Sequence, residues 1–79
     1  MKDEMIFEEI KKIVFNVAGA RHITMDTDLV KDLSLNSFDV VNMLAAVEQA
    51  FGIEISIQDV WELNQVKDIM VYLKRRLGE

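Results

Sequence analysis

The 79-residue sequence has no cysteine, no proline, three glycines and a single histidine. Without cysteine, the chain cannot form disulfides, thiolate zinc sites or a cysteine nucleophile. Three glycines are too few for a glycine-rich phosphate-binding loop, and no Gly-x-Ser-x-Gly segment surrounds any serine. No apolar run approaches the roughly 20 residues that a membrane helix needs, and the charged first ten residues do not form a signal peptide. These absences remove most familiar active sites and predict no membrane insertion.

The composition that remains favours one small folded domain. A hydrophobic fraction of 51% is too high for a disordered chain. A chain of this length forms one domain, here residues 1–79, with little core to spare for an enclosed active site. We therefore expect a cytoplasmic monomer that is stabilised by its hydrophobic core alone.

The charge of the chain is acidic and unevenly distributed. A formal net charge of -5 argues against nucleic acid as a partner, because phosphates require a basic surface. Between Asp32 and Val66 there are six acidic residues and no lysine or arginine, whereas the remainder carries nine basic and eight acidic residues. Such a segment is most often a solvated surface. The alternative is a docking surface for a basic partner.

Helical periodicity predicts the first two helices. Apolar residues recur at helical spacing over 6–17, and Gly19 follows as a C-terminal stop. A second apolar stripe lies in a helix over 37–51, with Asn36 as a suitable N-cap and Gly52 as the stop. An amphipathic pattern of this kind indicates helices that pack against a shared core.

The rest of the chain predicts an all-α fold. A third helix is expected over 66–77 with Asn64 as its cap. The alternating isoleucines of 53–57 would have no partner strand, so we expect an extended link and then a short helix over about 57–63. The long segment 20–36 is predicted to be an ordered loop pinned to the core by Leu29, Val30, Leu33 and Leu35. The result is a small four-helix bundle with three main helices, one short helix and a long ordered first loop.

The sequence predicts no metal site, and it favours no ligand site at Trp61 or at the methionines. The aspartate-rich stretch 26–32 has part of the spacing of a calcium loop. However, Lys31 stands where the turn needs glycine, and Ser37 stands where the last ligand should be glutamate. Trp61 and the five methionines are interpreted as core residues because their neighbours lie at helical spacing.

Ser37 is the hydroxyl with the most suggestive position. Serine is common at helix starts, so an ordinary structural role is the simplest interpretation. A hydroxyl on the first turn of a helix, after a long loop, is also accessible to another enzyme. The free N–H groups and the positive end of the helix would favour an attached phosphodiester. No residue nearby can act as a base on it, so any chemistry must be carried out by a partner.

The residues around Ser37 resemble the acyl carrier protein family. The family pattern is a D-L…D-L loop, an Asp-Ser-Leu attachment site, an apolar helix that ends in acidic residues and Phe, and an E-I-x turn. The corresponding residues of this chain are Asp28-Leu29, Asp32-Leu33, Asn36-Ser37-Phe38-Asp39 and Glu48-Gln49-Ala50-Phe51-Gly52-Ile53-Glu54-Ile55. The resemblance covers nearly the whole chain, including its length, its acidity and the order of its helices.

The resemblance implies that Ser37 carries 4′-phosphopantetheine, transferred from coenzyme A by a phosphopantetheinyl transferase. The chain would not be an enzyme; it would present acyl groups as thioesters to enzymes of fatty acid, lipid or polyketide-type biosynthesis. These acyl-loading and acyl-processing enzymes would use basic docking patches, and the candidate docking residues are Asn36, Phe38, Asp39, Asn42, Glu48 and Glu54. Family members can shelter an acyl chain between their helices, and the candidates for such a pocket are Met43, Leu44, Val47, Ile55, Trp61 and Ile69. Filling of the core is the favoured role of these six residues, and the pocket is the alternative. Trp61 is expected to restrict this space.

Several positions depart from the family pattern. Asn36 replaces the usual Asp, Phe38 the usual Leu, Asn42 a Glu, and Gln49 and Ala50 further acids, while Ser34 stands where Gly is common and Ser56 where Pro is common. The weaker acidity of the second helix predicts a narrower set of partners. A specialised pathway and the primary fatty-acid role are supported equally, and a D-alanyl or aminoacyl carrier is the alternative. From other classes, an unmodified acidic helical adaptor stays open, and a small enzyme has the least support.

Overall fold

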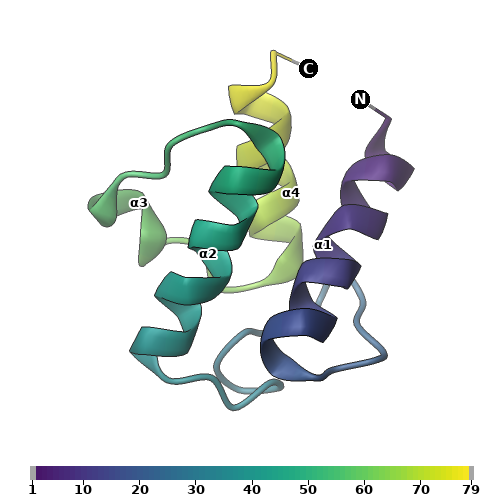
Figure 1. Ribbon diagram of the computed structural model, residues 1–79, viewed down its shortest axis with the longest axis vertical. Helices are drawn as coiled ribbons and strands as arrows, with labels where there is room; N and C mark the ends of the chain where they lie inside the picture. Colours follow the sequence, from purple (N-terminus) through teal and green to yellow (C-terminus); the bar gives the residue numbers. More distant parts are fainter. Residues whose placement is uncertain (1, 79) are drawn as a thin grey trace.

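The computed structural model describes residues 2–78, which form four helices joined by loops (Figure 1). Helix α1 spans Asp3–Ala18, α2 Ser37–Phe51, α3 Ile57–Val60 and α4 Val66–Arg76. Over these residues there is no strand, and the predicted all-α bundle with a long first loop is confirmed. None of the four helices is long and apolar enough to cross a membrane.

The predicted ends of α1 and α2 are confirmed. Gly19 and Gly52 follow the two helices in the left-handed conformation, with φ of 71° and 66°. Their N–H groups donate to the carbonyls of Phe15 and Glu48. Glycine adopts this conformation without a steric cost from Cβ, and it satisfies carbonyls that the helix end leaves free.

Two other helix boundaries differ from the prediction. α3 ends at Val60 instead of Leu63, because the chain turns there and the Leu63 N–H donates to the Val60 carbonyl at 3.2 Å. The N-cap of α4 is Gln65, so the predicted cap at Asn64 is wrong by one residue. The reason is Asp68, whose carboxylate accepts the N–H groups of both Asn64 and Gln65 at 3.0 and 2.9 Å.

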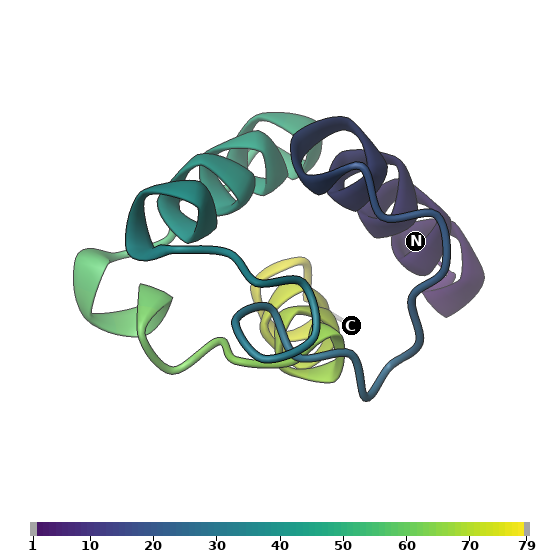
Figure 2. The ribbon, with the colours of Figure 1, turned by 90° about the horizontal axis from the view of Figure 1, so that it is seen from below.

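The three long helices enclose one hydrophobic core. Seen from below, α1 and α2 lie side by side above α4, and the first loop crosses in front of α4 (Figure 2). Buried side chains come from every helix and from the loops: Ile6, Ile10, Ile13, Val14, Ile23, Leu29, Leu35, Val40, Met43, Leu44, Val47, Val60, Leu63, Val66, Ile69, Met70 and Leu73. The burial of these side chains supplies the main stabilisation of so small a domain.

The methionines only partly follow the prediction that they are core residues. Met43 and Met70 are buried, which confirms the prediction for them. Met5 and Met25 are 57% and 40% exposed, so the prediction is wrong there. Met5 lies on the solvent side of α1, beside the buried stripe, and Met25 lies in the first loop. Met1 is outside the described residues.

The first loop is anchored to the core and to the start of α4. Leu29 and Leu35 are buried and Leu33 is half-buried, as predicted, whereas Val30 is 56% exposed. Backbone hydrogen bonds join the loop to the segment before and at the start of α4. The Leu29 N–H donates to the Asn64 carbonyl at 2.9 Å, the Val66 N–H to the Thr27 carbonyl at 3.0 Å, and the Lys67 N–H to the Met25 carbonyl at 2.9 Å. These bonds satisfy backbone groups that a loop packed on the core would otherwise leave unpaired.

Ser34 adopts a left-handed conformation just before α2, with φ of 56°. This conformation is strained for a residue with a Cβ and free of strain for glycine. Ser34→Gly is therefore expected to raise the free energy of unfolding by about 0.5 to 1 kcal/mol, after allowance for the greater freedom of glycine in the unfolded chain. Chemical denaturation measures it. Ser34→Ala keeps the Cβ and should give no gain; an equal gain in both variants would contradict the explanation.

Candidate functional site

The start of α2 is fixed by reciprocal hydrogen bonds between Asn36 and Asp39. The Asp39 N–H donates to Asn36 Oδ1 at 2.8 Å, and the Asn36 N–H donates to Asp39 Oδ2 at 3.4 Å. This capping box confirms Asn36 as the predicted N-cap. Ser37 follows it as the first helical residue, and its side chain is exposed. The cap therefore places the Ser37 hydroxyl at the positive end of a long helix, open to solvent.

The turn that leads to α2 is built by the two aspartates of the D-L…D-L pattern. Asp28 Oδ1 accepts the N–H groups of Val30 and Lys31 at 3.0 and 2.9 Å. The Asp28 N–H in turn donates to Asp32 Oδ2 at 2.7 Å. The leucine after Asp28, Leu29, is 1% exposed and anchors the turn in the core. In this chain the pattern thus has a structural use: it shapes the loop that leads to Ser37.

Asp28 gives this turn a pH dependence. Hydrogen bonds from the N–H of Lys31 and then of Val30, against an opposing effect of burial, lower the pKa of the Asp28 carboxyl below its ordinary value of 3.8. A group with a lowered folded-state pKa stabilises the fold above its unfolded pKa, and this contribution is lost as pH falls through the folded value. Urea denaturation should show that wild type has a higher free energy of unfolding than Asp28→Asn near neutral pH. The difference between the two free energies should shrink as pH falls below 3.8. A difference that does not change with pH would contradict this.

A hollow of about 260 Å³ opens beside Ser37. Its wall is largely apolar and comes from the first loop, the start of α2, and α3 with the residues after it: Leu29, Val30, Leu35, Asn36, Ser37, Val40, Val60, Trp61, Leu63 and Asn64. Apart from Asn36, Ser37 and Trp61, these residues were not predicted as site residues. Their positions depend on how the loop packs against α3, which no local sequence pattern reveals.

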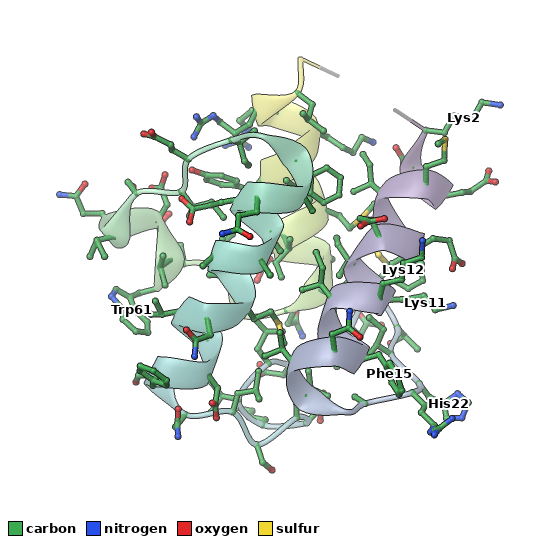
Figure 3. All side chains as sticks on the ribbon, in the orientation of Figure 1. Lys2, Lys11, Lys12, Phe15, His22 and Trp61 are labelled. Atoms are coloured by element: carbon green, nitrogen blue, oxygen red, sulfur yellow. The ribbon has the colours of Figure 1, made fainter. Side chains whose placement is uncertain are left out.

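Trp61 is the one predicted pocket residue that lines this hollow. The indole is 53% exposed at the end of α3, so the interpretation of Trp61 as a core residue is wrong. Because α3 is a single turn, the neighbouring Val60 takes the buried position and Trp61 faces outward. Trp61 lies on the flank of the molecule away from Phe15 and His22 (Figure 3).

The other predicted pocket residues lie elsewhere. Met43, Leu44, Val47 and Ile69 are at most 1% exposed and belong to the core between the long helices. Ile55 is half-buried and lines a second hollow together with Glu48, Glu54, Ser56 and Arg76. Apart from Trp61, the apolar side chains that line the hollow beside Ser37 therefore differ from the predicted pocket residues.

The predicted docking residues fall into two groups at opposite ends of α2. Asn36, Phe38 and Asn42 are exposed around Ser37, and Asp39 is half-buried in the capping box. Glu48 and Glu54 line the second hollow, with Glu48 about 16 Å farther along the helix axis than Ser37. Glu48 also has a structural contact, because its Oε2 accepts the Ile55 N–H at 2.8 Å.

Large apolar side chains are exposed near the start of α2 and on α3. Phe38 and Ile57 are each 72% exposed, and Val41 is 39% exposed. Phe38 and Val41 lie in α2 and Ile57 lies in α3, the two helices that line the hollow beside Ser37, and the exposed Trp61 directly follows α3. Val41 and Ile57 were not predicted as site residues, because in the sequence they extend apolar stripes. Exposed apolar side chains gathered at a site are typical of a surface that binds partners.

The start of α2 fits an attached phosphodiester. The N–H groups of Asp39 and Val40 donate to the side-chain and backbone oxygens of Asn36, respectively. The residues before Asp39 form the exposed start of the helix, at its positive end. This end attracts negative charge, and the hydroxyl of Ser37 is exposed there. The adjoining hollow offers apolar wall to a group that extends from the serine.

Comparison with known proteins agrees with this geometry. The family model described as "Phosphopantetheine attachment site" matches residues 8–73. The chain is 38% identical to the acyl carrier protein of Coprothermobacter proteolyticus, over 98% of this chain and 96% of the relative. It is 31% identical to that of Clostridium acetobutylicum, over 95% and 100%. Its identity to that of Solidesulfovibrio magneticus is 30%, over 94% and 97%. The chain therefore belongs to the acyl carrier protein family, non-enzymatic proteins that carry acyl groups on 4′-phosphopantetheine.

Proposed function

We propose that Ser37 is the residue that bears 4′-phosphopantetheine. The observation that carries the proposal is its position: an exposed hydroxyl on the first turn of α2, beside an apolar hollow. The positive helix end stabilises the negative charge of a phosphodiester at this residue. When attached, the arm supplies the thiol that the sequence lacks.

The neighbouring serines are less suited to this role. Ser34 lies in the loop with a positive φ, three residues before Ser37 and outside the helix. Ser56 precedes the single turn of α3, and its Oγ accepts the Asp59 N–H at 3.2 Å. Ser37 combines exposure with the N-terminus of a fifteen-residue helix. These differences support Ser37 over the other two hydroxyls of this region.

The residues around Ser37 hold the site in shape. Asn36 and Asp39 fix the start of the helix, and Asp28 fixes the turn before it, so the hydroxyl is presented at a defined place. The apolar wall of the hollow, including Trp61, shelters part of an acyl group from water, because burial of apolar surface is favourable. Each of these roles positions or protects the cargo; the reactions are carried out by partner enzymes.

We propose that partner enzymes dock around Ser37. Phe38 supplies an exposed aromatic contact, and the polar side chains of Asn36 and Asn42 lie beside it. Glu48, near the far end of α2, and Glu54, just beyond that end, supply negative charge that steers a basic patch toward the same helix. The partners in this proposal are a phosphopantetheinyl transferase and the acyl-loading and acyl-processing enzymes of fatty acid, lipid or polyketide-type biosynthesis, in the cytoplasm.

Residues 1–79 act in this proposal as a single carrier domain. The support is the one core to which all four helices contribute. Asparagine and phenylalanine on either side of Ser37, where the family has Asp and Leu, favour a narrower set of partners than that of a primary fatty-acid carrier.

Incubation with coenzyme A and a phosphopantetheinyl transferase tests the assignment. Intact-mass spectrometry should show one added phosphopantetheine on wild type and on Ser34→Ala, and none on Ser37→Ala. Ser34→Ala is the matched control, because it removes a hydroxyl only three residues away. A mass gain in Ser37→Ala, or no gain in wild type, would refute the assignment.

A further inference from the structure

A chain of hydrogen bonds connects α3 to α4 on one side of the short helix. The Tyr72 hydroxyl donates to Asp59 Oδ2 at 2.9 Å. Arg76 Nη1 donates to the Tyr72 hydroxyl oxygen at 3.0 Å and to the Glu54 carbonyl at 2.7 Å. Glu54 lies in the link before α3, and Asp59 lies in α3. The bonds from Arg76 to Glu54 and from Tyr72 to Asp59 therefore hold both segments against α4. We call these four residues the Tyr72 clasp.

The short helix α3 has few other anchors. It is a single turn of four residues, and such a short helix has no stability of its own. Val60 is its one buried residue, whereas Ile57 is 72% exposed. The segment after it is anchored by Leu63, which is 7% exposed. The Tyr72 clasp is therefore the main polar contact that fixes the position of α3.

The same short helix forms one wall of the hollow beside Ser37. Val60, Trp61 and Leu63 line that hollow, and the opposite wall comes from the first loop and the start of α2. Tyr72 is not among the lining residues within the described part of the chain. It reaches α3 from α4, so the Tyr72 clasp acts on this wall from outside the hollow. A change in the position of α3 therefore changes the width of the hollow.

We propose that the Tyr72 clasp sets the width of the hollow beside Ser37 and thereby limits the size of the acyl group that the protein can shelter. This inference rests on the proposed attachment at Ser37. An acyl chain on the arm gains free energy when the hollow buries its apolar surface. Beyond the size of the hollow, additional carbons stay exposed unless α3 moves away from α2. Tyr72 is thus a positioning residue for cargo size, through its contact with Asp59.

The protonation of Tyr72 suits this role. Partial burial, and then the hydrogen bond to the Asp59 carboxylate, raise the pKa of Tyr72 above its ordinary value of 10.0, and Arg76 opposes the rise. The hydroxyl consequently keeps its proton at neutral pH and remains a donor to Asp59.

The clasp itself is tested on the protein without an arm. In Tyr72→Phe, which keeps the ring but removes the hydroxyl, amide hydrogen exchange at Val60 and Leu63 should become roughly five-fold faster, as expected for one lost hydrogen bond. Asp59→Asn retains an acceptor for the hydroxyl and should stay within about two-fold of wild type. Arg76→Gln should also accelerate exchange. Arg75→Gln is its control, because it removes the same charge from an exposed neighbouring residue, and it should leave exchange unchanged. Exchange unchanged in Tyr72→Phe would overturn the proposal.

The effect on cargo is tested with saturated acyl groups of increasing length loaded on the arm. Melting temperature and Trp61 fluorescence should respond to each added length until the hollow is full. In Tyr72→Phe this response should extend to longer chains than in wild type and in Asp59→Asn. If the response depends on chain length in the same way in wild type, Tyr72→Phe and Asp59→Asn, the proposal is overturned, whereas Ser37 remains the attachment residue. Failure of wild type to load at Ser37 would instead overturn the proposed function, and the cargo limit with it.

Discussion

Replacement of Leu44 by alanine is expected to lower the free energy of unfolding by about 2–5 kcal/mol. Leu44 is 1% exposed in the middle of α2, on the face that packs into the core. The substitution removes buried apolar surface and leaves a cavity that the long helices fill only in part. The total stability of a small domain is about 5–15 kcal/mol, so this single change removes a large share of it. Urea denaturation followed by circular dichroism measures the loss.

The matched control for this prediction is Val41→Ala. Val41 is 39% exposed on the same helix, so its truncation should cost less than about 1 kcal/mol. A loss for Leu44→Ala no larger than that for Val41→Ala would mean that α2 does not pack into the core by the Leu44 face. The whole placement of Ser37 at the end of that helix would then be in question.

Replacement of Phe38 by alanine is expected to reduce kcat/KM for phosphopantetheinyl transfer by about 10-fold or more. The few hot-spot side chains near the centre of an interface contribute about 2 kcal/mol or more to binding, which corresponds to about 30-fold in affinity, and we expect Phe38 to be one of them. Phe38 is 72% exposed directly after Ser37, so its removal should leave the fold intact. Steady-state kinetics with the apo protein as the varied substrate measures the effect.

The effect should appear mainly in KM, because the interaction is made in the bound complex as much as in the transition state. Val71→Ala provides the control, since Val71 is 53% exposed and lies on α4, away from the start of α2. Equal losses in the two variants would show that general surface hydrophobicity, and not a docking surface at Ser37, determines the rate. No loss in Phe38→Ala would remove Phe38 from that surface.

The long helices could be predicted from sequence because their determinants are local. The apolar stripes of α1 and α2, the glycines that end them and the Asn36 cap all lie within the segments that they define. The structure confirms each of these features. The predicted cap of α4 was wrong by one residue because the carboxylate of Asp68 accepts the N–H groups of both Asn64 and Gln65, and the sequence does not show which of these two residues would act as the cap.

The position of Trp61 could not be predicted, because it depends on tertiary packing. In the sequence Trp61 follows an apolar pattern that is typical of a core helix. In the structure α3 is a single turn in which Val60 is buried and Asp59 accepts a hydrogen bond from Tyr72, and the indole of Trp61 is exposed and lines the hollow. These packing contacts join residues far apart in the sequence, 13 positions in the case of Tyr72 and Asp59.

The candidate site could be predicted only in part, because some of its features are local in the sequence and others depend on tertiary packing. Ser37 stands out through the motif around it and through its position at a helix start. The lining of the hollow comes from Leu29, Leu35 and Leu63, which the fold brings together from separate segments. From the sequence, Leu29 and Leu35 are predicted only to anchor the loop, and their second role as part of the wall of the hollow appears only in the folded structure.

The most direct test of the central claim is the location of the phosphopantetheine group by tandem mass spectrometry. Trypsin cuts after Lys31 and Lys67, and the segment 32–67 that it releases contains the serines Ser34, Ser37 and Ser56 and no other hydroxyl side chain. Fragmentation between these three positions assigns the added mass to one of them. The account predicts that the entire added mass lies on Ser37. Added mass on Ser34 or Ser56 would contradict it.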